Sequence, residues 1–392
     1  MDLPITIVNA RSSIHNLEMP YREKAWKSMI NRIRKSFARA TECKHGGKVQ
    51  DAASILGAEP LDFSANINPL GSPKLDNLIL EEIKKINHYP DNSYREFRRA
   101  AGNFVNVDMK CIVPGNGSSE LIRLFAECCL EDGDLCLVPT PSFGEYANQS
   151  LLAGATIKKL KIDEDGLPHL NESDLEEAKL LFLCNPNNPT GKLLSRGKVI
   201  DLADRCEQAE TFLLVDEAFI ELSDPQQSVA ETAPNRRFLF VMRSLTKSFG
   251  VPGLRLGFGV ANETLAGILN LVRIPWSIGS IAAAAASYLL GCEEHLEHSR
   301  RFIKEELDWL QPALRDLGLA PTTSSVNFIL VNIEPTGLTS DTLAMRTMSQ
   351  GVLVRDCQSF GLGKSYIRVA VRSRRENEQL IAALKKALSC RD

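Results

Sequence analysis

Short apolar runs alternate with helical patterns between about residue 75 and residue 275, and this alternation constrains the fold more than any other feature. The runs include CIVPGNG, LCLVPTPSF, KLLFLCNPNNPTG, TFLLVDEAF and RFLFVMRSLTKSFG, and helical patterns such as SSELIRLFAECCLEDG separate them. Apolar strands that alternate with helices predict a mostly parallel sheet covered on both faces. Ligands bind such sheets beyond the carboxyl ends of the strands, where these runs carry turn residues.

The pattern changes from about residue 292. A charged helical segment, EEHLEHSRRFIKEELDWLQPALRDLG, leads to the runs VNFILVNI, GVLVRDC and YIRVAVRS and to a last helix. This order predicts a smaller α+β domain. We therefore expect an N-terminal extension at 1–44, a segment at 45–75 that contributes to the active site and the small domain, a large domain at 76–275 and a small C-terminal domain at 276–392.

Composition excludes several classes of function. The chain has 392 residues, of which 44% are hydrophobic and 24% charged, and its formal net charge is −3. This balance argues against nucleic acid as the main partner. No apolar run approaches the roughly 20 residues that span a membrane. The longest, Ser277 to Gly291, is short and rich in alanine, so we expect a packed helix and no membrane partner.

The 10 cysteines form no CxxC pair and no Cys/His cluster with zinc spacing, so no metal site is predicted. Cys128 and Cys129 lie on an apolar helical pattern, and Cys184 lies in an apolar strand. Buried free thiols in a reducing cytoplasm explain this usage, and a cytoplasmic location is expected.

The N-terminal extension contains a basic amphipathic stretch from Tyr21 to Ala40. A transit peptide, a membrane-surface helix and a partner contact all fit this pattern. The acidic residues Glu18, Glu23 and Glu42 weaken the transit interpretation. We expect an arm that packs on the body or on a second subunit.

Polar residues follow two of the apolar runs. Asp216 ends the run that begins at Phe212, where a carboxylate is costly unless a positive or hydrogen-bonding partner meets it. It is either a turn cap or a carboxylate that faces a cationic ring nitrogen. Asn187 and Asn188 form a turn with Pro189 at the same predicted edge of the sheet.

Two further segments suit a phosphate group. Gly115 and Gly117 precede Ser118 and an apolar helix, and a helix N-terminus attracts anions, although a simple serine cap is the alternative. In RSLTKSFGVPGLRLG, residues 243–257, Lys247 stands among hydroxyl residues and upstream of an arginine. This lysine is either a charge partner for the phosphate or a nucleophilic amine.

Together the motifs NPNNPTG, DEAF and SLTKSFGVPGLRLG resemble the pyridoxal-phosphate (PLP) enzymes of the aspartate-aminotransferase fold, over about residues 45 to 390. The resemblance implies the fold-type I architecture, with 76–275 as the PLP-binding domain. It implies that Lys247 and Asp216 are catalytic, the lysine as a Schiff base to the cofactor and the aspartate as partner of the ring nitrogen. A free lysine has a pKa of about 10.4, so burial and nearby positive charge must favour its neutral form.

The same resemblance implies the remaining cofactor contacts. Asn188 would bond the phenolic oxygen, and Phe143 would stack on the ring unless it only packs in the core. The phosphate would be held by the residues Gly117, Ser118, Ser244, Thr246 and Arg255.

Two branches of this superfamily fit, the histidinol-phosphate aminotransferases and the threonine-phosphate decarboxylases of the cobalamin pathway. KHGGKVQDAASILG, LDFSANINPLGSP and Phe219, where aminotransferases usually carry tyrosine, resemble the decarboxylases. A short helix cap at His45 and a buried ion pair at Arg368 are the alternatives for those residues. The decarboxylase resemblance implies substrate contacts from His45, Gly46, Asn66, Tyr89, Asn188, Arg355 and Arg368.

This branch implies a homodimer in which Tyr89 reaches the neighbouring subunit's site. The implied reaction converts the phosphorylated amino acid O-phospho-L-threonine to (R)-1-amino-2-propanol O-phosphate, for the cobalamin nucleotide-loop linker, or O-phospho-L-serine to ethanolamine phosphate. A histidinol-phosphate or related aminotransferase is the alternative enzyme. A catalytically idle PLP-binding regulator is the alternative from another class.

Overall fold

A computed structural model provides the fold, and the structure describes residues 29, 31–38, 43, 46–47 and 49–389. The chain forms two compact units, Met1–Thr41 and Glu42–Asp392. In the first unit the short helix α3 (Lys35–Ala38) is described, and most of the predicted basic arm lies outside the described residues. Everything that follows concerns the second unit.

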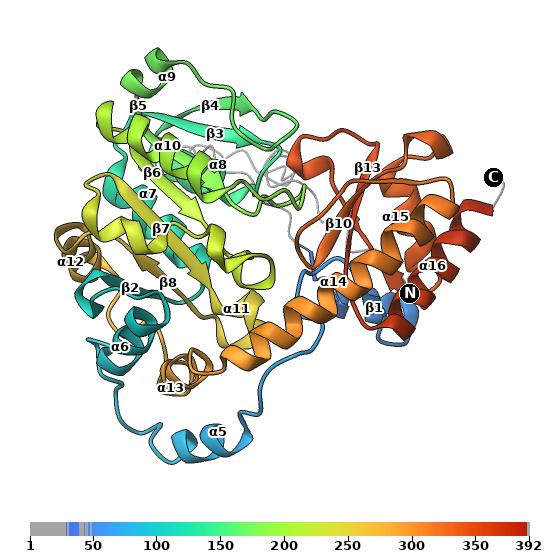
Figure 1. Cartoon of the computed structure of the whole chain (residues 1–392), viewed down its shortest axis with the longest axis horizontal. Coiled ribbons are helices and arrows are strands. Elements are labelled where there is room, and N and C mark those ends of the chain that lie inside the picture. Colours follow the sequence, from blue (N-terminus) through green and yellow to red (C-terminus); the bar gives the residue numbers. More distant parts are fainter. Residues whose placement is uncertain (1–28, 30, 39–42, 44–45, 48, 390–392) are drawn as a thin grey trace. The chain divides into compact units, whose positions relative to one another are not determined.

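A seven-stranded sheet forms the centre of the second unit (Figure 1). Its strand order is β2 (Ile112–Gly115), β8 (Gly257–Val260), β7 (Leu239–Ser244), β6 (Phe212–Asp216), β5 (Ala178–Cys184), β3 (Leu135–Thr140) and β4 (Thr156–Lys161). Strand β8 is antiparallel to both neighbours, and the other neighbouring pairs are parallel. The expected mixed, mostly parallel sheet is therefore confirmed.

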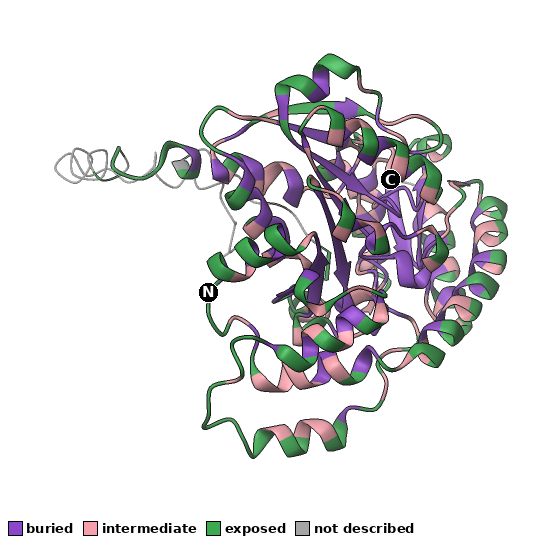
Figure 2. Ribbon diagram, turned by 60° about the vertical axis from the view of Figure 1, so that its left-hand side comes forward, coloured by how far each residue is buried: buried purple, intermediate pink, exposed green. Residues whose placement is uncertain are grey.

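The central strands are apolar on both faces because helices cover both sides. In β6, Leu213 and Val215 belong to one core cluster and Leu214 to the other. The first cluster includes residues of α6 (Arg95–Phe104), α10 (Arg196–Gln208) and α13 (Ser280–Leu289), and the second includes α7 (Ser118–Cys129), α8 (Glu145–Ala153) and α12 (Glu263–Val272). Figure 2 shows the buried strands between partly exposed helices. Each fully buried large apolar side chain contributes about 1.5–3 kcal/mol.

A smaller antiparallel sheet forms the C-terminal part, in the order β12 (Arg355–Asp356), β13 (Tyr366–Ala370), β10 (Phe328–Asn332) and β9 (Ala320–Pro321). Its core cluster includes residues of α14 (Glu293–Asp316), α15 (Ser340–Met348) and α16 (Arg374–Ser389). The run GVLVRDC divides here, because β11 (Val352–Leu353) pairs with β1 (Leu61–Asp62) in a separate parallel pair. The small α+β fold is confirmed, whereas the exact domain boundaries stay a prediction.

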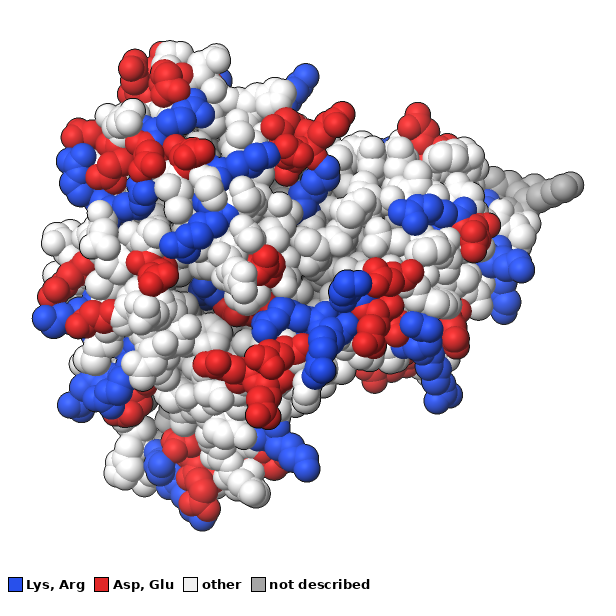
Figure 3. Space-filling view, in the orientation of Figure 1, with Lys and Arg blue, Asp and Glu red and all other residues white. Residues whose placement is uncertain are grey.

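The remaining helices are short and lie mostly at the periphery. They are α4 (Val49–Leu56), α5 (Asp76–Ile83), α9 (Glu172–Glu177) and α11 (Leu245–Ser248), the last directly after β7. On the face shown in Figure 3, positive and negative side chains are interspersed. Of the helices that the structure describes, none combines the length and the apolar character needed to cross a membrane.

The cysteines of the described residues are free thiols. Cys129 and Cys184 are buried as expected, but Cys128 is exposed, which corrects the expectation that it is buried. Cys128 lies at the edge of the buried stripe of α7, which consists of Leu121, Ile122, Phe125, Ala126 and Cys129. Within the described part of the chain, no group of His, Cys, Asp and Glu side chains is arranged to hold a metal ion.

Candidate active site

A cavity of about 350 Å³ lies beyond the carboxyl ends of the central strands, and residues of the small sheet form part of its lining. It falls within the usual size range of small-molecule sites, about 300–1,000 Å³. Its lining contains most of the residues that the sequence singled out, namely Gly46, Asn66, Ser118, Phe143, Asn188, Asp216, Ser244, Thr246, Lys247, Arg255, Arg355 and Arg368. Residues more than 300 positions apart thus meet in one cavity.

Lys247 enters the cavity from α11, the short helix that follows β7. Burial, followed by the positive charges of Arg368 and Arg255, lowers the pKa of its ammonium group to about 8. Both causes disfavour the charged form of an amine. A substantial fraction of Lys247 is therefore neutral near physiological pH, as a nucleophilic amine requires.

An anion cradle lies beside Lys247. Helix α7 begins at Ser118, and its N-terminus offers positive potential to the cavity. Gly117 has φ = +78°, and a Cβ atom there would lie 2.5 Å from Nη2 of Arg255. The positive φ favours glycine at this turn, and a larger residue would also require the guanidinium to shift. Arg255 itself has φ = +53°, a left-handed conformation that costs about 1–3 kcal/mol and that clusters at ligand sites.

The two hydroxyl residues of the cradle differ in their contacts. Within the described part of the chain, the buried Oγ of Ser244 has no hydrogen-bond partner. Thr246 Oγ1 lies 3.3 Å from the carbonyl oxygen of Leu256, so its hydroxyl already has a backbone acceptor. An orphaned hydroxyl, an arginine and a helix N-terminus around one cavity fit a phosphate group. These residues therefore suit a cofactor with a phosphate and an aldehyde beside Lys247.

Asp216 ends β6 and points into the cavity, and its carboxylate is almost completely buried. Tyr146 Oη donates to its Oδ2 at 2.6 Å, and the backbone N–H of Ala218 donates to its Oδ1 at 2.9 Å. Burial nevertheless raises the pKa of this carboxyl to about 6. A cationic ring nitrogen opposite Asp216 would supply the charge that this buried carboxylate lacks.

Tyr146 is a site residue that the sequence analysis missed. Its ring is completely buried, stacks on Phe182 at 4.8 Å and meets Phe143 edge to face at 5.7 Å. One side chain thus touches both the predicted ring-stacking residue and the carboxylate of Asp216. The spacing of three residues between Phe143 and Tyr146 at the start of α8 is the signal that could have identified it.

Two arginines from neighbouring strands of the small sheet line the wall of the cavity. Arg355 and Arg368 are directly paired across β12 and β13, and both are buried. Arg368 donates to Asn188 Oδ1 and to the carbonyl oxygen of Ser64 at 2.8 Å. Arg355 donates to Ser359 at 2.8 Å, and the ring of Phe360 lies near both guanidiniums, at 5.5 and 5.7 Å.

Like charges directly opposite in a sheet repel each other. Burial lowers the pKa of Arg368 to about 10, since desolvation disfavours its charge. Within the described part of the chain, Nε of Arg368 has no hydrogen-bond partner. An anion bound between these arginines would offset both the repulsion and the desolvation.

Asn66 and Gly46 complete the wall. Asn66 is buried, and its Oδ1 has no partner among the described residues. A Cβ atom at Gly46 would lie 2.4 Å from the carbonyl oxygen of Ser64, so a larger residue would displace the segment that holds Arg368. The lining also includes Cys43, Ser359 and Phe360, which the sequence analysis did not single out.

Besides Gly117, which directly precedes the lining residue Ser118, two predicted site residues are not placed in this cavity. Tyr89 is 81% exposed, and its ring lies 4.7 Å from that of Trp276, away from the cavity lining of its own chain. Its predicted role in a neighbouring subunit's site stays a prediction. His45 lies outside the described residues.

Known proteins resemble this chain over most of its length. Residues 58–384 match the family model for aminotransferase class I and II. The threonine-phosphate decarboxylase of Salmonella typhimurium is 33% identical over 88% of this chain and 96% of its own. The histidinol-phosphate aminotransferase of Symbiobacterium thermophilum is 33% identical over 92% of this chain and 99% of its own.

The solved structures include a histidinol-phosphate aminotransferase from Clostridium acetobutylicum, which is 31% identical with a TM-score of 0.77 and covers 84% of this chain and 99% of its own. The chain belongs to the aminotransferase class I and II family, as a fold-type I enzyme that depends on pyridoxal 5′-phosphate.

Proposed function

We propose that this enzyme decarboxylates O-phospho-L-threonine, which yields carbon dioxide and (R)-1-amino-2-propanol O-phosphate, the linker of the cobalamin nucleotide loop. O-phospho-L-serine, which lacks only a methyl group, is the second substrate in this proposal. The observation that carries the proposal is the opposed pair Arg355 and Arg368 in the cavity wall. Two guanidiniums suit a substrate that bears both a carboxylate and a phosphate. The similarity to the S. typhimurium decarboxylase supports it.

In this proposal the carboxyl ends of the central strands hold PLP. Lys247 would bind the aldehyde carbon through its amine, and Asp216 would keep the pyridine nitrogen protonated. Phe143 would pack on the ring face, and Asn188 would donate to the phenolic oxygen through Nδ2, because its Oδ1 accepts from Arg368. The cradle formed by Gly117, Ser118, Ser244, Thr246 and Arg255 would hold the phosphate group.

When bound, PLP takes up the electron pair of whichever α-carbon bond stands perpendicular to its ring. The chain decides which bond this is. Arg355, Arg368 and Asn66, together with His45 and Gly46, grip the substrate so that its carboxylate stands out of the ring plane. The bond between the α-carbon and the carboxylate then breaks, and carbon dioxide leaves. The α-carbon then gains a proton, which Lys247, once the substrate's amine has displaced it from the cofactor, or a water would supply.

Histidinol-phosphate transamination is the second candidate, favoured by the similarity to the S. thermophilum and C. acetobutylicum aminotransferases. Histidinol phosphate carries a phosphate but no carboxylate, so it offers the two opposed guanidiniums one anionic group, whereas O-phospho-L-threonine offers two. The cavity also presents Phe219, which packs edge to face on Phe328 at 5.1 Å and offers the cofactor no hydroxyl. Both features favour the decarboxylase.

We also propose that the enzyme is a homodimer. The rings of Tyr89 and Trp276 contact each other at the surface, tilted by 33°, and nearby apolar side chains are exposed, with Leu271 84% exposed. Burial of such side chains against a second copy contributes about 25 cal/mol per Å² of apolar surface. Light scattering at working concentration should give about twice the chain mass, and a monomeric mass with full activity would contradict this proposal.

The experiment that tests the reaction compares two substrates under the same conditions. The PLP-loaded enzyme is mixed with O-phospho-L-threonine or with L-histidinol phosphate plus 2-oxoglutarate, and products are identified by NMR. We expect 1-amino-2-propanol O-phosphate from the first mixture and little glutamate from the second. Glutamate formation without carbon dioxide release would instead identify an aminotransferase. No turnover of any amino acid would support a regulator that binds PLP without catalysis.

A further inference from the structure

We propose that Arg243, with Glu217, Glu221 and Ser228, forms a positioning cluster that aligns the carboxyl ends of β6 and β7, so that Asp216 and Ser244 face the PLP cavity together. None of these four residues belongs to the site described above, and no motif in the sequence analysis assigned them a role. The inference rests on the cofactor contacts proposed for Asp216 and Ser244. It does not depend on which reaction the enzyme catalyses.

The cluster is built from the immediate neighbours of cofactor-facing residues. Glu217 follows Asp216, and Arg243 precedes Ser244. Neighbouring residues of an extended chain point to opposite sides. Accordingly, Asp216 and Ser244 line the PLP cavity, whereas Arg243 lines a second cavity of about 370 Å³ that also includes Glu221 and Ser228.

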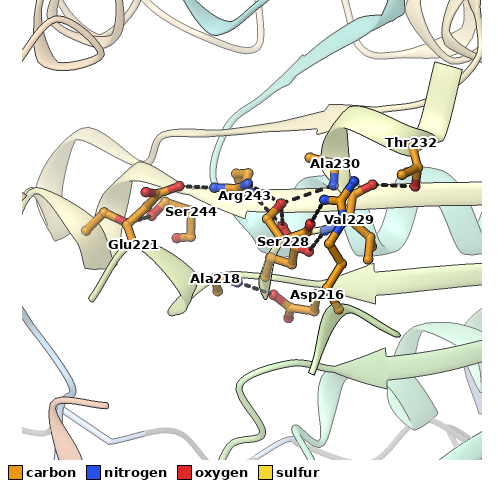
Figure 4. Close-up of polar contacts among 12 residues, drawn as sticks. Asp216, Ala218, Glu221, Ser228, Val229, Ala230, Thr232, Arg243 and Ser244 are labelled. Carbon is orange, nitrogen blue, oxygen red and sulfur yellow. Dashed lines mark hydrogen bonds and ion pairs between the residues drawn. The ribbon is translucent and has the colours of Figure 1, made fainter. Parts of the chain in front are cut away.

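Charge-assisted contacts join the two strand ends behind the cofactor cavity (Figure 4). Nε of Arg243 forms an ion pair with Oε2 of Glu217 at 2.8 Å, without the geometry of a hydrogen bond, and its Nη1 pairs with Oε1 of Glu221. Its Nη2 donates to Ser228 Oγ at 2.6 Å, and that hydroxyl donates to Glu217 Oε2 at 2.8 Å. The N–H of Glu217 continues the sheet by donating to the carbonyl oxygen of Met242 at 2.9 Å.

The cluster also connects the strand ends to other parts of the fold. The N–H of Val229 donates to Glu217 Oε1 at 2.8 Å. Arg300, on α14, donates to the carbonyl oxygen of Glu221 at 3.0 Å. The long helix that leads into the small sheet is thereby tied to the turn after Asp216. A shift of one strand end against the other would break several of these contacts at once.

Burial of these charged groups has a desolvation cost. A gain in folding stability does not account for a cluster with this cost. Arg243, Glu217 and Glu221 are all buried, and each buried ion loses several kcal/mol of hydration. Well-packed apolar residues often stabilise a fold as much as a buried ion pair does. What charged contacts add is directionality, because bonds of fixed length and angle define one register. The PLP site requires Asp216 and Ser244 at fixed positions, and contacts of fixed length and angle hold them there.

The test separates positioning from stability through cofactor affinity. The variants are Glu221→Gln and Ser228→Ala. The control is Glu306→Gln, which removes the charge of a buried glutamate that pairs with the half-exposed Arg374 (3.0 Å) between α14 and α16, outside the PLP cavity. For each, the dissociation constant of PLP is measured by titrating cofactor-free enzyme, and the urea midpoint of the cofactor-free enzyme is measured in parallel.

We expect the PLP dissociation constant to rise about tenfold in both cluster variants, which corresponds to about 1.4 kcal/mol. The Glu306→Gln control should lower the urea midpoint but leave the PLP dissociation constant within twofold of the wild type. If Glu221→Gln does not fold, Ser228→Ala decides, because it removes one hydroxyl and no charge. An unchanged PLP dissociation constant in the cluster variants, or an equal rise in the control, would overturn the proposal. Failure to release carbon dioxide would not affect this result.

Discussion

Asp216→Asn should move the stability and the activity of this enzyme in opposite directions. Burial raises the pKa of Asp216 from its ordinary value of 3.8 to about 6 in the cofactor-free fold. Between these two values the unfolded chain has lost the proton that the folded chain still holds. The folded state therefore binds more protons, and its stability falls as pH rises through this window.

The structure gives the size of this effect. A shift of about two pKa units corresponds to about 3 kcal/mol at 1.36 kcal/mol per unit, and all of it is lost above pH 6. Asparagine does not ionise and can still accept from the Ala218 N–H. The cofactor-free variant should therefore be up to about 3 kcal/mol more stable than the wild type at pH 8. The two should be nearly equal at about pH 4.

Urea unfolding of the cofactor-free proteins at several pH values measures this difference, with Asp201→Asn, at an exposed position of α10, as the control. The same Asp216→Asn variant should bind PLP yet lose about 100-fold or more in kcat, because a neutral amide cannot stabilise a pyridinium. A gain in stability that does not depend on pH would refute the electrostatic reasoning. Near-normal turnover would show that Asp216 does not face the ring nitrogen.

Two further substitutions test the cavity wall. Tyr146→Phe removes a hydrogen bond to a charged group, and such a bond contributes about 1.5–3 kcal/mol. The substitution should raise the pKa of Asp216 further and weaken PLP binding about tenfold or more. The acid limb of the pH–rate profile should therefore move to higher pH. An unshifted profile would contradict the contact. Arg368→Lys keeps the charge but loses the planar grip; the ratio of pyridoxamine phosphate to carbon dioxide per turnover should rise. If both rates fall together at a constant ratio, Arg368 supplies affinity only.

The sequence predicted those parts of the fold in which the apolar pattern allows only one interpretation. The apolar runs of β5, β6 and β7 are buried on both faces, so their composition indicates central parallel strands without further information. The polar residues at their ends, such as Asn188, Asp216 and Lys247, were predicted to share one edge, and the cavity lining places them there.

Two strands of the seven-stranded sheet were missed for identifiable physical reasons. The edge strand β4 contains Lys158, Lys159 and Lys161 and is mostly exposed, so it lacks the apolar signal of a buried strand. The strand β8, of sequence GFGV, is rich in glycine, which lowers strand propensity. Gly259 is required there, because a Cβ atom would lie 2.1 Å from the ring of Phe240.

The contacts that join distant segments could not be predicted from the sequence. Arg368 contacts the carbonyl oxygen of Ser64, 304 positions earlier. The cluster around Arg243 depends on the side to which Glu217 points, and only the paired strands determine this. Tyr146 is intermediate, since its spacing from Phe143 was visible but its bond to Asp216 was not.

The proposed placement of PLP, and with it the role of every other residue in the cavity, depends most directly on Lys247 as the residue that binds the cofactor. Treatment of the PLP-loaded enzyme with borohydride, followed by proteolysis and mass spectrometry, locates the lysine that carries the reduced cofactor. Lys247 lines the same cavity as Asp216 and Arg255, which predicts that the label lies on the peptide that contains Lys247. A label on any other lysine, with Lys247 unmodified, would contradict the placement of the cofactor and the roles proposed around it.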